Sequence, residues 1–138
     1  MIESKLMLVS ALTRRYVYAA TISLALTVLV FSVFDMRFDL SYRIWWWDSL
    51  EHFLGGVCIG FFTLVGIEIF KLRKHRMMLV LAGVLVAGLA WELMEYLTGL
   101  TDSPFMSYPM DSFKDVVLDL MGGYIAARIG HLMHVLYL

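Results

Sequence analysis

The sequence predicts an all-α, polytopic membrane protein in which four transmembrane helices form an antiparallel bundle. Hydrophobic residues make up 61% of the 138 residues, whereas soluble domains are usually about 45–50% apolar. The excess lies in long apolar runs, which is typical of membrane spans. Polar segments separate these runs, and only two prolines occur in the chain. We therefore expect one transmembrane domain over residues 1–138, with no linker.

The first span is predicted at residues 16–34, which contain no charged residue. Such a run is long enough to cross a hydrocarbon core of about 30 Å. A cleaved signal peptide has a shorter apolar core, so we expect a retained helix. Residues 35–48 follow as an interfacial aromatic connector, because Trp45, Trp46 and Trp47 favour the membrane–water interface. A short helix lying flat and an ordinary loop both fit this connector.

Three further spans are predicted at residues 50–70, 77–97 and 113–137. A tight basic turn at 71–76 joins the second span to the third, and a polar connector at 98–111 joins the third to the fourth. Basic residues are biased towards the end of the bundle that holds the termini and the basic turn. Eight lie on that side (Lys5, Arg14, Arg15, Lys71, Arg73, Lys74, Arg76 and Arg128), against three on the other (Arg37, Arg43 and Lys114). The positive-inside rule then predicts cytoplasmic N and C termini in a bacterial inner membrane.

Ionisable residues gather at the opposite end of the predicted bundle. Antiparallel threading brings together the start of the second span, the end of the third and the start of the fourth. The residues concerned are Asp48, His52, Glu92, Glu95, Asp115 and Asp119. Helical periodicity places Asp111, Asp115, Asp119, Gly122 and Ala126 on one face, so the acidic face continues as a small-residue seam. Ionised groups at membrane depth are costly and usually functional.

Some of these acids also have a structural interpretation. Asp48 with Glu51 resembles a capping box, and Asp111 has the position of a helix cap. Capping does not explain Glu92 and Glu95, because the helix dipole disfavours acids near a helix C-terminus. The remaining carboxylates either share protons or bind a metal ion. A histidine among carboxylates suits zinc, manganese or iron.

We therefore predict a divalent metal with His52, Glu92, Glu95 and Asp119 as ligands. Asp48 and Asp115 would orient these ligands or act as the base. A second set, Arg128, His131 and His134, lies at the opposite end of the fourth span. Such groups either bind metal or extend to the interface, and the second behaviour is the commoner.

The order of these motifs resembles the VanZ-like and YjdF-like families of small bacterial membrane proteins. The matching motifs are Asp48-x3-His52-Phe53, Glu92-x2-Glu95, and Asp115-x3-Asp119-x2-Gly122. Asp119 stands where those families are expected to have Asn. The resemblance implies a multi-span membrane protein, with some members linked to glycopeptide-antibiotic resistance, and it implies no reaction.

Three functional hypotheses follow. The first is a metal-dependent membrane enzyme whose outward-facing site acts on a lipid or lipid-linked substrate. The second is a non-enzymatic protein that binds a cation, lipid or drug-like molecule. The third is an ion-coupled carrier working as a homo-oligomer, since four helices alone enclose a narrow pathway. A net charge of −1 gives no reason to expect nucleic acid, and the lone Cys58 makes neither an intrachain disulfide nor a thiolate metal site.

Overall fold

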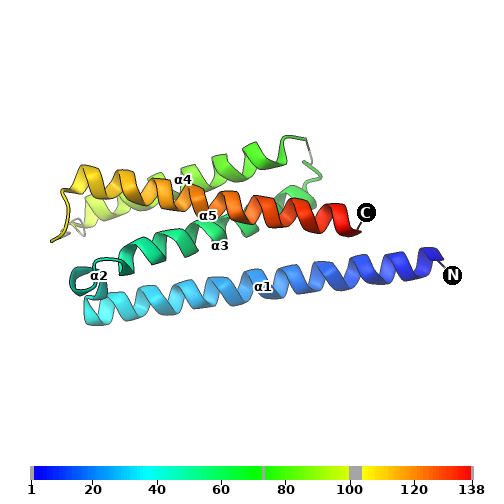
Figure 1. Cartoon of the computed structure of the whole chain (residues 1–138), viewed down its shortest axis with the longest axis horizontal. Helices are drawn as coiled ribbons and strands as arrows, with labels where there is room; N and C mark the ends of the chain where they lie inside the picture. The colour runs from blue at the N-terminus through cyan, green and yellow to red at the C-terminus, as the bar shows by residue number, and fades with distance from the viewer. Residues whose placement is uncertain (1, 73, 100–103, 138) are drawn as a thin grey trace.

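The computed structural model describes residues 2–72, 74–99 and 104–137, with side chains placed from residue 15 to residue 133 of these ranges. The helices in these ranges are α1 (Ile2–Phe38), α2 (Leu40–Arg43), α3 (Trp47–Ile69), α4 (Arg76–Thr98) and α5 (Tyr108–Tyr137). The four long helices run alongside one another in alternating directions, with the termini and the α3–α4 turn at one end and both connectors at the other (Figure 1). The predicted all-α fold class is confirmed.

Each long helix contains a stretch that is apolar enough to cross a membrane. These stretches are Arg15–Phe38, Trp47–Ile69, Arg76–Thr98 and Tyr108–Met133. Each overlaps one span expected from the sequence. α5 starts earlier than 113, at Tyr108, because the backbone N–H groups of Met110 and Asp111 both donate to the carbonyl of Ser107. Pro109 is tolerated in this first turn, where a backbone N–H has no helical partner.

The aromatic connector contains a short helix, α2, rather than only an ordinary loop. Asp39 adopts a left-handed backbone (φ 51°) between α1 and α2. The carboxylate of Asp35 then accepts hydrogen bonds from the backbone N–H and the hydroxyl of Ser41. Trp45 and Trp46 are 71% and 45% exposed, which leaves both rings free to lie at an interface.

α3 is the central helix, since it packs against α1, α4 and α5. The apolar core lies in the half of the bundle near the α3–α4 turn. It is formed by Leu64, Ile67, Val80, Val84 and Ala127. The half nearer the connectors holds the buried polar residues instead. Ordinary side-chain packing in one half therefore supports a polar cluster in the other.

The closest helix contact in the bundle is between α3 and α5, and it depends on glycine. A Cβ added at Gly56 would overlap the backbone of Asp119, and one added at Gly122 would overlap the backbone of Phe53 and Val57. Such backbone approach is the usual way in which small residues tighten membrane helix pairs. The predicted small-residue seam therefore lies at this crossing.

Replacing Gly122 by alanine should lower stability, because the new methyl group would meet backbone atoms that cannot rotate away. Overpacking typically costs about 1–3 kcal/mol, more than the about 0.5–1 kcal/mol that alanine gains over glycine in a helix. Thermal unfolding of the purified variant in detergent measures the difference. The matched control is Gly66→Ala, where nothing lies within 4 Å of the added Cβ; its melting temperature should be equal or higher. Equal melting of both variants would contradict the assigned helix crossing.

Candidate functional site

The structure brings the six predicted site residues together at the connector end of the bundle. Asp48 and His52 come from α3, Glu92 and Glu95 from α4, and Asp115 and Asp119 from α5. Four of them are almost fully buried: His52, Glu92, Asp115 and Asp119 are 7%, 7%, 3% and 6% exposed. They form the main group of buried polar side chains in the described chain, with Thr21 on α1 as the other buried polar residue. Burial at this level requires a partner for each charge.

His52 is at the centre of the cluster, and its Nε2 atom faces carboxylates from three helices. Nε2 lies 3.6 Å from Asp48 Oδ1, 4.0 Å from Glu92 Oε1 and 4.0 Å from Asp115 Oδ2. These separations exceed the range of about 2.7–3.2 Å that is typical of N–H···O hydrogen bonds. A ring nitrogen carries one proton or one lone pair, so it satisfies at most one of the three oxygens. His52 therefore belongs to two groups of possible metal ligands, one with Asp48 and Asp115 and one with Glu92 and Glu95.

The other imidazole nitrogen faces Asp119. Nδ1 of His52 lies 3.5 Å from Asp119 Oδ2. Space for this carboxylate comes from Gly88 on α4, where an added Cβ would lie 2.5 Å from Asp119 Oδ2. Glycines on both neighbouring helices thus leave room for Asp119 beside the imidazole ring. His52 lies between Asp119 on one side and three carboxylates on the other.

A lysine that the sequence analysis assigned only to the charge balance belongs to the site. Lys114 Nζ lies 3.0 Å from Asp48 Oδ2, 2.6 Å from Asp111 Oδ1 and 3.2 Å from Asp115 Oδ1. Asp48 and Asp115 therefore each direct one oxygen to Lys114 and the other towards His52. The sequence feature that could have assigned Lys114 to the site is its spacing of three residues from Asp111, which places opposite charges together on a helix.

Two aromatic residues support the α4 side of the cluster. The indole N–H of Trp91 donates to Glu95 Oε1 at 2.8 Å. The hydroxyl of Tyr108 donates to the backbone carbonyl of Glu92 at 3.0 Å. The Tyr108 ring also stacks on Tyr96, with centroids 5.9 Å apart. The two contacts of Tyr108 hold the C-terminal turns of α4 against the start of α5.

The capping interpretation does not describe the acids at the helix starts. Trp46 occupies the N-cap position of α3, and no side-chain hydrogen bond caps that helix. Asp48 lies within the first turn and contacts Lys114, as Asp111 does in α5. Of the second set, Arg128 and His131 are exposed, which agrees with extension to the interface. The side chain of His134 lies outside the part of the chain that the structure describes.

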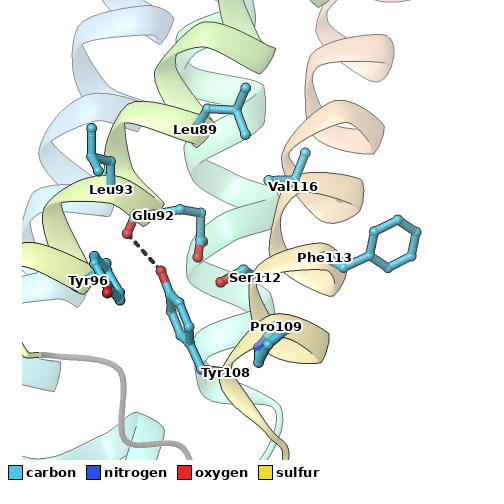
Figure 2. Close-up of a pocket in the computed structure, with 9 residues that line it drawn as sticks. All are labelled: Leu89, Glu92, Leu93, Tyr96, Tyr108, Pro109, Ser112, Phe113 and Val116. Carbon is cyan, nitrogen blue, oxygen red and sulfur yellow. Dashed lines mark hydrogen bonds between the residues drawn. The ribbon is translucent and has the colours of Figure 1, made fainter.

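An apolar groove of about 450 Å³ runs between α4 and α5 beside the cluster. Figure 2 shows its lining, which consists of Leu89, Glu92, Leu93, Tyr96, Tyr108, Pro109, Ser112, Phe113 and Val116. Glu92 belongs to both the groove and the cluster. Its Oε1 atom and the hydroxyl of Ser112 are buried, and neither has a hydrogen-bond partner among the described residues. The surface of the groove is therefore apolar, and two unpartnered polar atoms are buried within its lining.

The model of a family described as a predicted membrane protein (DUF2238) matches residues 4–135. The chain belongs to this family. The match agrees with the bundle of membrane-length helices, and the narrower VanZ-like or YjdF-like resemblance stays a prediction. No curated protein and no solved structure matches the chain.

Replacing Lys114 by methionine should destabilise the protein, because Asp48, Asp111 and Asp115 would lose their common counter-ion. Lys114 is partly exposed, so the expected loss is about 1–3 kcal/mol, below that for a fully buried pair. Thermal unfolding at several pH values tests this expectation. The deficit should shrink in acid, where protonation of the carboxylates removes their repulsion. Lys74→Met, in the exposed turn at the other end, is the control and should melt as the parent does; an equal loss in both variants would contradict the role given to Lys114.

Proposed function

We propose that this protein is a membrane enzyme that binds a divalent metal ion at the Nε2 atom of His52 and acts on a lipid or lipid-linked substrate. The observation that carries the metal site is the single ring nitrogen facing three carboxylates from α3, α4 and α5. One proton satisfies one of these contacts, whereas one cation is shared by several ligand atoms, such as those of His52, Asp48 and Asp115. One of the facing carboxylate oxygens, Oε1 of Glu92, is buried and has no hydrogen-bond partner among the described residues, which supports a ligand at this point.

The spacing of the facing atoms supports the same proposal. Two ligands bound about 2.1 Å from one ion at a tetrahedral angle lie about 3.4 Å apart. The separations of 3.6–4.0 Å around Nε2 need only a small contraction to reach this value. Nitrogen with carboxylate oxygen favours zinc, manganese or iron over magnesium and calcium.

The geometry favours a different division of roles from that predicted from the sequence. Asp48, Asp115 and Glu92 all face Nε2. Asp48 and Asp115 form one group of possible ligands with His52, and Glu92 forms the other with Glu95. Asp119 faces Nδ1, which is the position of a carboxylate that orients a metal-binding histidine. Asp48 and Asp115 thus take the ligand role assigned to Asp119, and Asp119 takes the orienting role assigned to them.

Glu95 is the carboxylate best placed to accept a proton. Glu95 forms a group of possible ligands with His52 and Glu92, whose ligand atoms lie within 4.8 Å of one another. It is less buried than Glu92. The indole of Trp91 fixes one of its oxygens and leaves the other available. A bound divalent ion would supply Lewis-acid polarisation of an ester, amide or phosphoryl oxygen. The apolar groove that ends at Glu92 supports a substrate with an aliphatic chain.

Removing the metal should lower the melting temperature of the purified protein. Binding to the folded state alone contributes about 2.7 kcal/mol at a hundredfold excess over Kd. A chelator should abolish this contribution, and zinc or manganese should restore it. Elemental analysis of the untreated protein measures the metal directly. No bound metal, together with melting that does not respond to the chelator, would contradict the proposal.

Variants locate the metal within the chain. His52→Ala should abolish the recovery with metal, whereas His131→Ala, exposed at the far end of α5, should leave it intact. Asp119→Asn should retain the metal with about 10–100-fold weaker affinity, as expected for an orienting group. Turnover of lipids in a membrane extract, followed by mass spectrometry with and without metal, tests the enzymatic part separately.

A second candidate function follows from Lys114. A protonated His52 could donate from both ring nitrogens, and Lys114 already neutralises part of the acidic charge. The same side chains would then form a proton-sharing network in a non-enzymatic cation-, lipid- or drug-binding protein, or in an ion-coupled carrier acting as a homo-oligomer. In that case stability should rise on mild acidification and should not respond to metal.

We also propose that the site faces the outside of a bacterial inner membrane, with both termini in the cytoplasm. The bias of basic residues towards the α3–α4 turn supports this orientation. In a Cys58→Ser background, a cysteine replacing the exposed Ser107 should react with a membrane-impermeant thiol reagent applied from outside. A cysteine replacing Lys74, at the other end, should react only after the membrane is opened. The reverse pattern would place the site on the cytoplasmic side.

A further inference from the structure

We infer that the groove between α4 and α5 binds the aliphatic chain of a membrane lipid whose headgroup is neutral or cationic and donates a hydrogen bond to Glu92. This inference rests on the proposed function in that it names the substrate class for the same site. Its evidence differs from that for the metal site. It is based on the shape and lining of the groove and on the sign of the charge at its inner end. The shape and apolar lining of the groove do not depend on whether a metal is bound.

The lining of the groove selects the chain. Leu89, Leu93, Phe113 and Val116 make its walls, and the first three are 52%, 57% and 70% exposed. These residues lie within the membrane-length stretches of α4 and α5, so the groove opens towards the hydrocarbon. A volume of about 450 Å³ falls in the usual range for small-molecule sites. An alkyl chain can enter it from the bilayer without passing through water.

The inner end of the groove selects a hydrogen-bond donor. Glu92 Oε1 and Ser112 Oγ are the buried polar atoms without partners there, and both side chains point into the space between α4 and α5 (Figure 2). An ionised carboxylate accepts hydrogen bonds and cannot donate them. A hydroxyl or amine headgroup supplies the missing donor, whereas a fully ionised phosphate offers only acceptor oxygens.

Charge selects against an anionic headgroup. Six carboxylates lie in the cluster, with one lysine and one histidine to balance them: Asp48, Glu92, Glu95, Asp111, Asp115, Asp119, Lys114 and His52. Counted as ionised, the six carboxylates outnumber the positive charges even with a protonated histidine or a bound divalent ion. The stacked rings of Tyr96 and Tyr108 line the groove as well, and aromatic faces attract cations. A lipid with an anionic phosphate headgroup would be repelled by Glu92.

Photo-crosslinking of the full chain in phosphatidylcholine vesicles tests this inference. The probes are three lipids with a diazirine on the alkyl chain and different headgroups: a monoacylglycerol, a long-chain amine and a phosphatidate. Mass spectrometry locates the labelled peptides. We expect the glycerol and amine probes to label α4 and α5 along the groove about tenfold more than phosphatidate, the ratio given by about 1.4 kcal/mol of binding free energy. The exposed face of α1 around Leu26 and Leu29 gives the baseline for general lipid contact.

Matched variants separate the groove from the bilayer. Val116→Phe fills the groove and should remove the excess labelling, whereas Val117→Phe, the next residue on α5 and outside the lining, should leave it unchanged. Glu92→Gln should keep the chain in the groove but reduce the preference over phosphatidate. Equal labelling of the two phenylalanine variants, or strong labelling by phosphatidate, would overturn the inference.

The outcome is separable from the metal proposal. Elemental analysis of Val116→Phe should show the same metal content as the parent, because Val116 contacts the groove and lies outside the metal-binding group. Selective labelling that persists in a protein without metal would support the lipid groove and contradict the metal enzyme. Metal binding without selective labelling would contradict the groove and leave the metal site standing.

Discussion

The close crossing of α3 and α5 is the constraint on which the rest of the site depends. Gly56 and Gly122 let the two backbones approach to a distance that any Cβ would prevent. That contact fixes which turns of the two helices face each other. Asp119, about one turn before Gly122, then faces one nitrogen of His52, and Asp115, one turn earlier still, faces the other. A looser crossing would leave the same residues on the same faces without joining them.

Electrostatics gives the cluster its chemistry. The positive ends of the α3 and α5 dipoles favour the aspartates in their first turns, whereas the end of α4 disfavours Glu92 and Glu95. Lys114 balances part of the aspartate charge, and it contacts one oxygen each of Asp48 and Asp115, whose other oxygens face His52. A lysine within the site thus orients the carboxylates and still leaves them in excess. This remaining negative charge is the common basis for the proposed metal and for the proposed preference among lipids.

In the proposed mode of lipid binding, the groove links this polar cluster to the bilayer. Glu92 faces His52 on one side and the apolar space between α4 and α5 on the other. A lipid that enters along the groove would therefore bring its headgroup to the cluster while its chain stays among leucine, valine and phenylalanine. Tyr108 stabilises this arrangement by bonding to the backbone of Glu92 and stacking on Tyr96. Membrane location, groove and polar cluster are consistent with one another in this arrangement.

The sequence by itself determined the fold class, the four spans and the end of the bundle at which the polar residues meet. Hydropathy and helical periodicity are local properties, and antiparallel threading turns them into a shared depth and side. Only the tertiary structure decided that Asp119 faces Nδ1 while Asp48 and Asp115 face Nε2, and that Lys114 belongs among them. The reason is that rotation of each helix about its axis and the choice of side-chain rotamer depend on contacts between helices, which no local pattern specifies.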